Sequence, residues 1–210
     1  MSKVIAFSGG VYSGKTTTLK ALKLALEKVG KKVVMLDELI RITTDKPIDK
    51  LRLEPSEYFH IQEKIITQKM KQERMAFNDA SDTIYLLDRS IYDSLFYLRN
   101  YVDTCRLTES ELASFYKLHS TVTLFASYAA LKYDSVYVFY PLHSKREDDK
   151  FRPRLLNDAS MYEYHCIRTL VKYSKCDKEN TFKYFEVDLN RINTEQVINF
   201  IVNEYKGTNR

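Results

Sequence analysis

Apolar residues along this chain fall into short runs that are separated by longer segments with helical spacing. The largely apolar runs cover residues 4–7, 33–36, 84–87, 136–139 and 184–187. Runs of this length between polar residues are typical of buried strands. Helical spacing and helix caps predict helices at about residues 15–29, 56–77, 92–101, 108–132, 157–175 and 194–205. Strands that alternate with helices predict an α/β fold, with a parallel sheet covered by helices on both faces.

Several predicted helix ends carry cap residues. Gly30 follows the first helix, at a position where glycine commonly ends a helix. Ser56 is suited to begin the second helix, and either Asn157 or Asp158 the fifth. Residues 108–111 read TESE, the pattern of a capping box. We therefore expect a long helical stretch, continuous or broken, to begin there.

Residues 9–16 read GGVYSGKT and match the pattern G-x-x-x-x-G-K-[ST] between a predicted strand and a predicted helix. This context is the one in which the pattern forms a phosphate-binding loop. Its glycines let the backbone curl so that consecutive N–H groups point inward at a helix N-terminus. Lys15 would reach the β- and γ-phosphates, and the Thr16 hydroxyl would bind Mg²⁺. The alternative is a glycine turn before a helix, with Lys15 exposed by chance.

This loop predicts that the chain binds a nucleoside triphosphate, which we take to be ATP, together with Mg²⁺. The predicted nucleotide-binding residues are Gly9, Gly10, Val11, Tyr12, Ser13, Gly14, Lys15, Thr16 and Thr17.

Length and composition favour one enzyme-sized domain. The chain has 210 residues, 44% hydrophobic residues and a formal net charge of +5. That charge suits a protein that handles phosphates. It is too small to demonstrate a surface that binds nucleic acid. Its three cysteines lack metal-ligand spacing, so we expect reduced thiols in the cytoplasm. The short apolar start predicts neither a signal peptide nor a membrane segment. We expect a single domain over residues 1–210, with a lid at about 142–156.

The third predicted strand ends in Asp88-Arg89. In a phosphate-loop site, an acid at this position holds Mg²⁺ directly or through water. A turn residue or helix cap is the alternative for Asp88. Arg89 could grip a phosphate with its planar guanidinium, or form a structural ion pair with Asp93.

The second predicted strand ends in Asp37-Glu38. A carboxylate there could accept the proton of an attacking hydroxyl or bind a sugar, and solvated charges are the alternative. Gln62 lies among aromatic residues on the second predicted helix. Its amide could read the edge of a base, or it could be an exposed helix residue.

Residues 145–154 read KREDDKFRPR, between a predicted strand and a predicted helix. Arginines on a lid can stabilise the charge of phosphoryl transfer while the lid excludes water. The candidates are Arg146, Arg152 and Arg154, and a solvated surface loop is the alternative.

Taken together, these segments resemble those of known kinases. The resemblance rests on GGVYSGKTT, the strand end LDELIR, the helix FHIQEKIITQ, the segment LLDRSIYDSLFYL and the charged segment KREDDKFRPR. They are similar to nucleoside and nucleotide kinases of the thymidylate-kinase-like phosphate-loop superfamily, in the nicotinamide-riboside-kinase-like and deoxynucleoside-kinase-like branches.

The resemblance implies a five-stranded parallel sheet in the order 2-3-1-4-5 and a role for several residues. Asp88-Arg89-Ser90 matches the acid-Arg-Ser segment, whose arginine contacts phosphate. Glu38, with Arg41 nearby, matches the acid that holds the acceptor hydroxyl. Gln62 matches the glutamine that pairs with a base. Arg146 and Arg152 match the lid arginines. The glutamate-proline-glycine signature of true thymidylate kinases is absent, which argues against thymidylate as the substrate.

The main hypothesis is therefore a Mg²⁺- and ATP-dependent kinase of a small nucleoside or nucleotide. In this hypothesis the catalytic residues are Lys15, Asp37 or Glu38, Asp88, Arg89, Arg146 and Arg152. The residues that hold the metal are Thr16 and Asp88. The first alternative is a kinase of 5-hydroxymethyluracil in DNA, as in a related phage branch, which would place the protein in a host cytoplasm. The second is a regulatory ATPase. The long helices after Ser56 and Thr108 could pair in a homodimer.

Overall fold

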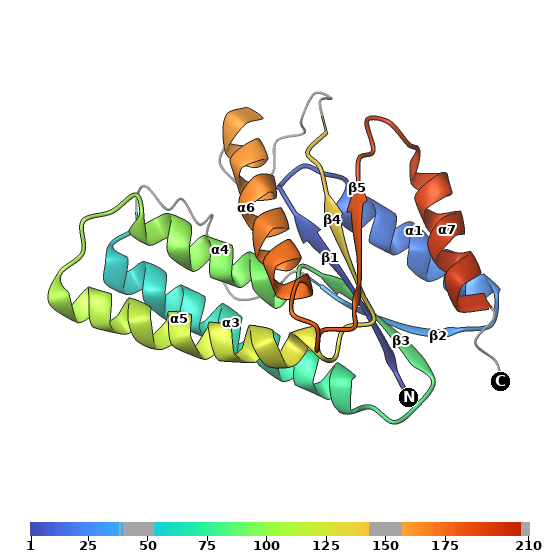
Figure 1. Ribbon diagram of the computed structural model, residues 1–210, viewed down its shortest axis with the longest axis horizontal. Coiled ribbons are helices and arrows are strands. Elements are labelled where there is room, and N and C mark those ends of the chain that lie inside the picture. Colours follow the sequence, from blue (N-terminus) through green and yellow to red (C-terminus); the bar gives the residue numbers. More distant parts are fainter. Residues whose placement is uncertain (38, 40–52, 143–156, 207–210) are drawn as a thin grey trace.

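A computed structural model of the chain describes residues 1–37, 39, 53–142 and 157–206. Five parallel strands form one sheet, which crosses the centre of Figure 1. The strands are β1 (Lys3–Gly9), β2 (Lys32–Leu36), β3 (Thr83–Asp88), β4 (Ser135–Phe139) and β5 (Lys183–Val187). Their order is β2-β3-β1-β4-β5, so the predicted α/β class and strand order are confirmed.

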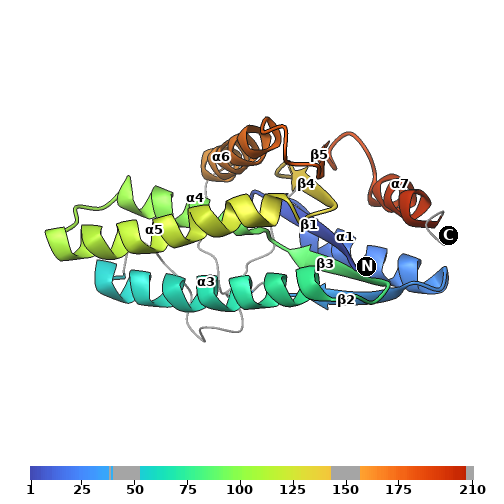
Figure 2. The same ribbon diagram turned by 60° about the horizontal axis from the view of Figure 1, so that its bottom comes forward.

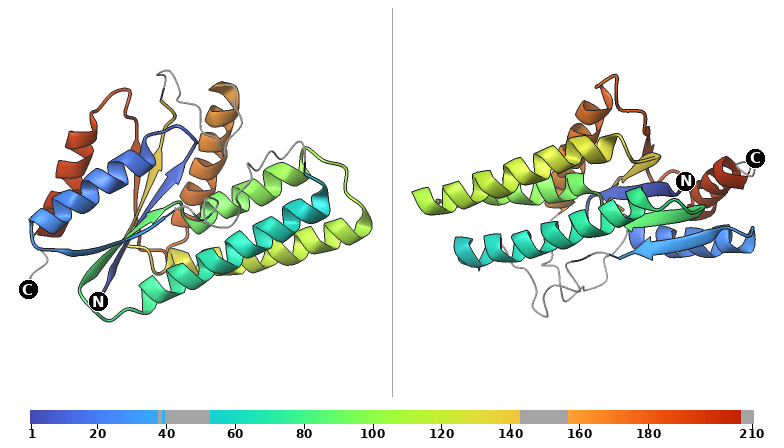
Figure 3. Two further views of the ribbon diagram at one scale, coloured as in Figure 1. Left: turned by 180° about the vertical axis from the view of Figure 1, so that it is seen from behind. Right: turned by 90° about the horizontal axis from the view of Figure 1, so that it is seen from below.

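Helices cover both faces of this sheet. They are α1 (Lys15–Lys28), α3 (Pro55–Asn78), α4 (Ile91–Val102), α5 (Glu109–Ala130), α6 (Asn157–Lys175) and α7 (Thr194–Lys206). Seen from behind in Figure 3, α1 and α7 lie side by side on one face. The other face packs against α3, α4, α5 and α6, and the long pair α3 and α5 extends beyond the sheet (Figures 1 and 2).

Alternate residues of each central strand enter two separate hydrophobic clusters. In β1, Val4 and Ala6 pack under α3 to α6, whereas Ile5 and Phe7 pack under α1 and α7. All four side chains are at most 1% exposed. A parallel strand that is buried on both faces must be apolar throughout. This requirement explains why the central strands β1, β3 and β4 contain continuous apolar runs, whereas β2 and β5 are only partly buried.

Helix boundaries differ in detail from the sequence predictions. The predicted start at Ser56 is wrong, because α3 begins at Pro55 after Glu54. Proline suits the first helical position, where its fixed φ fits and its missing N–H costs nothing. The predicted capping box is confirmed, since Thr108 and Glu111 bond reciprocally and α5 runs unbroken to Ala130.

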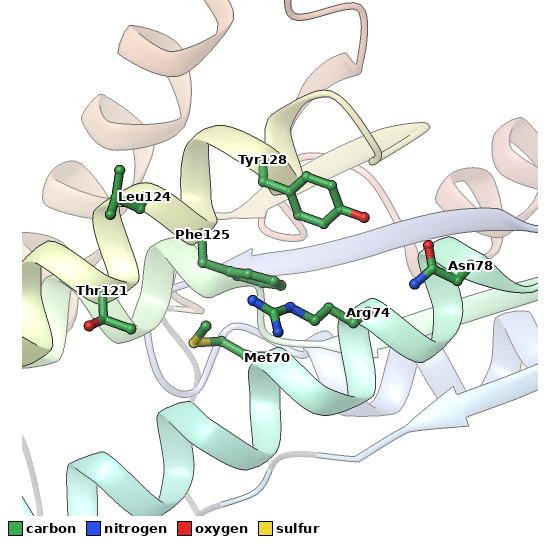
Figure 4. Close-up of a pocket in the computed structure, with 7 residues that line it drawn as sticks. All are labelled: Met70, Arg74, Asn78, Thr121, Leu124, Phe125 and Tyr128. Atoms are coloured by element: carbon green, nitrogen blue, oxygen red, sulfur yellow. The ribbon is translucent and has the colours of Figure 1, made fainter.

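A shallow groove of about 550 Å³ runs between α3 and α5 (Figure 4). The guanidinium of Arg74 lies 5.4 Å from the ring centre of Phe125 in this groove. The residues that line it are Met70, Arg74, Asn78, Thr121, Leu124, Phe125 and Tyr128. None of these belongs to the phosphate loop or to the strand ends, so the groove is separate from the candidate site. Within the part of the chain that the structure describes, no helix is long and apolar enough to cross a membrane.

Candidate nucleotide-binding site

The phosphate loop, residues 9–16, connects the carboxyl end of β1 to the first turn of α1. Gly9 has a φ of 114°, and a Cβ at this position would collide with the carbonyl oxygen of Phe139 in β4. Only glycine fits such a close backbone approach. Ser13 donates a 2.8 Å hydrogen bond to the Gly10 carbonyl, and Leu142 N–H donates to the Tyr12 carbonyl at 3.1 Å. The loop is therefore held both internally and by the segment that follows β4.

The Lys15 ammonium group lies inside the curve of this loop. It donates hydrogen bonds to the carbonyl oxygens of Gly9 (2.9 Å) and Gly10 (2.6 Å) and to the Ser13 hydroxyl (2.9 Å). Burial lowers the pKa of Lys15 from 10.5 to about 8, and the charge of Arg89 acts in the same direction. The negative charges of Glu163, Asp93 and Asp88 oppose this shift. Lys15 is buried, so the alternative in which it is exposed by chance is wrong.

Thr16 and Asp88 come together across the first turn of α1 and the end of β3. The Thr16 hydroxyl donates a 2.6 Å hydrogen bond to Oδ2 of Asp88. A hydroxyl and a carboxylate are hard oxygen ligands of the kind that Mg²⁺ prefers. Among the described residues, no group of three or more His, Cys, Asp or Glu side chains could hold a metal alone. This donor set fits Mg²⁺, which commonly binds one or two protein oxygens together with substrate phosphates.

Arg89 follows Asp88 and has an unusual backbone for a residue with a side chain, with a φ of 81°. Its guanidinium is buried, and Nη1 lies 2.9 Å from Asp93 and 3.1 Å from Glu163. The guanidinium carbon also lies 5.2 Å from the ring centre of Tyr97. The predicted ion pair with Asp93 is therefore present. Backbone strain of this kind is concentrated at functional sites.

Glu163 of α6 is a site residue that the sequence analysis missed. Its carboxylate accepts hydrogen bonds from the Val11 N–H (2.9 Å), from Arg89 (3.1 Å) and from the Tyr97 hydroxyl. It lies 74 positions from Arg89 in the sequence, and no spacing motif connects the two. Only the packing of α6 on the phosphate loop brings them together.

The structure describes only some of the residues that were predicted to bind the acceptor or the nucleotide or to form the lid. Asp37 follows β2 and is exposed. Gln62 on α3 is 5% exposed, so the alternative of an exposed helix residue is wrong. Nearby on α3, Tyr58 stacks on Tyr101 at 3.7 Å between ring centres. Thr17 is exposed in the first turn of α1. Glu38, Arg41, Arg146, Arg152 and Arg154 lie outside the described residues.

Comparison with known proteins agrees with this architecture. A protein-family model described as an AAA domain matches residues 4–178. No curated protein matches the sequence.

Solved structures of similar fold include two kinds of protein. The NadR protein in complex with NAD and AMP-PNP has a TM-score of 0.62 and 19% identity, covering 100% of this chain and 51% of NadR. A deoxyadenosine kinase from M. mycoides, with dCMP and dCDP bound, has a TM-score of 0.52 and 18% identity. That match covers 96% of this chain and 97% of the kinase. The chain thus spans about half the length of NadR, and at these identities the likeness shows the fold.

Proposed function

The chain belongs to the AAA domain family, and from this premise we propose that it is a Mg²⁺- and ATP-dependent kinase of a nucleoside or nucleotide. The transferred group is the γ-phosphate, and the acceptor is a hydroxyl or phosphate. Support comes from the fold, which is shared with a deoxyadenosine kinase and with an AMP-PNP complex of NadR.

The observation that carries the proposal is the pair of buried cations at the phosphate loop. Lys15 and Arg89 are 5% and 7% exposed, and the charge of Arg89 lowers the pKa of Lys15. Mutual repulsion and the loss of water both oppose the burial of these two cations, and the carboxylates of Glu163, Asp93 and Asp88 counteract that effect. The negative charge of a bound triphosphate would favour both cations further. The site therefore suits phosphoryl transfer, in which charge spreads over the γ-phosphate oxygens.

Each donor-side residue has a role in this proposal. Lys15 binds the β- and γ-phosphates, and Arg89 stabilises negative charge that develops during transfer. Thr16 and Asp88 would hold Mg²⁺, which neutralises phosphate charge when bound. Backbone N–H groups between Gly9 and Thr17, apart from that of Val11, which donates to Glu163, complete the nucleotide site.

The acceptor side follows the resemblance to kinases. Asp37 or Glu38 orients the acceptor hydroxyl, with Arg41 beside it. Gln62, which is 5% exposed on α3, contacts a base. Arg146 and Arg152 neutralise charge from a lid.

Transfer from γ-labelled ATP tests the proposal. The screen covers nucleosides, nucleoside monophosphates, nicotinamide riboside and DNA that contains 5-hydroxymethyluracil, with Lys15→Met as the inactive control. Label on one small-molecule class supports the proposal and names the acceptor. Label on DNA alone supports the DNA kinase instead. ATP hydrolysis that no acceptor changes supports a regulatory ATPase and contradicts a kinase.

A further inference from the structure

The backbone carbonyl of Arg89 accepts a hydrogen bond from the ammonium group of Lys69 on α3. Lys69 is 4% exposed, which is unusual for a lysine. The carbonyl that it contacts belongs to the residue with a φ of 81°. A side chain in this left-handed region is disfavoured unless its surroundings hold it there. Lys69 is therefore placed where it can stabilise an otherwise unfavourable conformation.

Glu73 fixes the position of Lys69 from one helical turn away. Its Oε1 lies 3.4 Å from the Lys69 ammonium, and the two side chains are 0% and 5% exposed. The other carboxylate oxygen, Oε2, accepts a 2.8 Å hydrogen bond from the Tyr133 hydroxyl. The Tyr133 hydroxyl in turn accepts a 3.3 Å hydrogen bond from the Ile91 N–H. The segment from Arg89 to Ile91 is thus held at both ends by one buried network.

A buried ion pair is a costly way to stabilise a fold. Removing two charges from water costs free energy that their attraction regains only with very good geometry. Apolar residues of similar size often give equal or greater stability at such positions. Stability alone therefore does not explain why a charged pair occupies the interface between α3 and the end of β3. The position of its partner, the Arg89 backbone, offers a better explanation.

We propose that Lys69, oriented by Glu73 and Tyr133, is a positioning residue that holds Arg89 in its left-handed conformation with its guanidinium at the phosphate loop. The inference rests on the proposed kinase function, because it assigns Lys69 an effect on phosphoryl transfer through Arg89. The same helix carries Gln62, so α3 joins the acceptor side of the site to the support of Arg89.

The first test is Lys69→Met, which keeps the length of the side chain and removes its donor. We expect kcat to fall about 10- to 100-fold, since a displacement of about 1 Å at a reacting group can cost this much. KM for ATP should change less than threefold. Lys71→Met, an exposed position on the same helix, should behave like the wild type. A wild-type kcat in Lys69→Met would overturn the proposal.

A second variant separates positioning from stability. Lys69→Met combined with Glu73→Gln removes both charges and leaves an amide oxygen to accept from Tyr133. We expect its thermal midpoint to recover towards the wild type while kcat stays low. Recovery of kcat together with stability would show that the pair is merely structural.

The decisive measurement is a double-mutant cycle with Arg89. If Lys69 acts only through Arg89, Lys69→Met should leave kcat unchanged when Arg89→Ala is already present. The same fold loss in both backgrounds would overturn the proposal. A crystal structure of Lys69→Met tests it without any activity. A negative φ or a displaced guanidinium at Arg89 supports the inference, and an unchanged Arg89 contradicts it. The crystal structure remains a valid test even if the wild type transfers no phosphate. That result would reject only the proposed kinase function, and not the inference about Lys69.

Discussion

The carboxylate of Glu163 accepts a 2.9 Å hydrogen bond from the backbone N–H of Val11, which joins α6 to the phosphate loop. A loop built to bind an anion therefore has a buried carboxylate as its neighbour. Arg89 compensates for this charge from 3.1 Å away. Glu163 thus stabilises the loop and also adds negative charge beside the proposed triphosphate.

The first prediction is that Glu163→Gln has opposite effects on stability and on nucleotide binding. Loss of a charged hydrogen-bond acceptor costs about 1.5–3 kcal/mol of the free energy of unfolding. Loss of the negative charge should lower the Kd for ATP several-fold. Thermal unfolding and calorimetric titration measure the two effects, and Glu57→Gln on the exposed face of α3 is the matched control. Weaker ATP binding in a variant that is fully stable would contradict this interpretation.

Lys15→Met should separate activity from stability in another way. Removal of an electrostatic donor aimed at transition-state charge costs about 10²–10³-fold in kcat. An apolar side chain removes the cost of burying the Lys15 charge, but it also removes the hydrogen bonds to Gly9, Gly10 and Ser13. These two effects oppose each other, so the thermal midpoint should stay close to that of the wild type. Phosphoryl transfer and thermal unfolding are measured on the same preparation. Transfer at the wild-type rate would reject the proposed role of Lys15.

ATP binding should be accompanied by proton uptake in alkaline buffer. The pKa of Lys15 is about 8 in the free protein, and phosphate charge should raise it towards or above its ordinary value of 10.5. At pH about 8.5–9.5, part of the Lys15 population is neutral before binding and must gain a proton. Calorimetry in buffers of different ionisation enthalpy measures this uptake. Lys15→Met should show none of it, and equal uptake in both proteins would exclude Lys15 as the group.

The same pKa shift predicts how stability depends on pH. Between pH 8 and 10.5 the unfolded chain binds more protons at Lys15 than the folded chain does. The free energy of unfolding should therefore gain a positive contribution with rising pH in this window. In Lys15→Met this contribution is absent, so the free energy of unfolding of the wild type should rise relative to that of the variant as the pH rises. A constant difference across the window would contradict the shifted pKa.

Two glycine variants should separate loop geometry from backbone strain. A Cβ on Gly10 would lie 2.7 Å from the Ser160 carbonyl oxygen of α6, so Gly10→Ala must push α6 away from the phosphate loop. Overpacking of this kind costs about 1–3 kcal/mol. Gly30 has a φ of 82° with open space around its Cα, so Gly30→Ala should cost about 1–2 kcal/mol through strain alone. Only Gly10→Ala should weaken ATP binding; an equal effect of both on the Kd would show that global stability is the cause.

Asp88→Asn should raise the Mg²⁺ requirement. The amide oxygen can still accept the hydrogen bond of Thr16, while the charge that attracts the metal is lost. We expect the half-saturating Mg²⁺ concentration to rise at least about 10-fold. Asp82→Asn, an exposed position just before the other end of β3, is the control. A Mg²⁺ dependence identical to that of the wild type would remove Asp88 from the metal site.

Local patterns predicted much of the fold. Residues 4–7 are apolar because β1 is buried on both faces, and residues 9–16 must curl where β1 gives way to α1. Alternation of strands and helices gave the parallel sheet, whereas the strand order came from the resemblance to kinases. Helix starts were less reliable. The reciprocal bonds of Ser90 and Asp93 begin α4 one residue before the predicted start, and Pro55 begins α3.

The sequence by itself determined which residues lie at the carboxyl edge of the sheet. Asp88 ends an apolar run that predicts a strand, and Lys15 belongs to the phosphate-loop pattern that follows another. Strands of a parallel sheet end on the same side, so both residues must lie at that edge. Tertiary structure decided what surrounds them. Glu163 and Lys69 lie on different helices, 74 and 20 positions from Arg89. Their contacts depend on how α6 and α3 pack on one face of the sheet. Helical periodicity specifies which face of a helix is buried, but it contains no information on which distant polar group that face will meet.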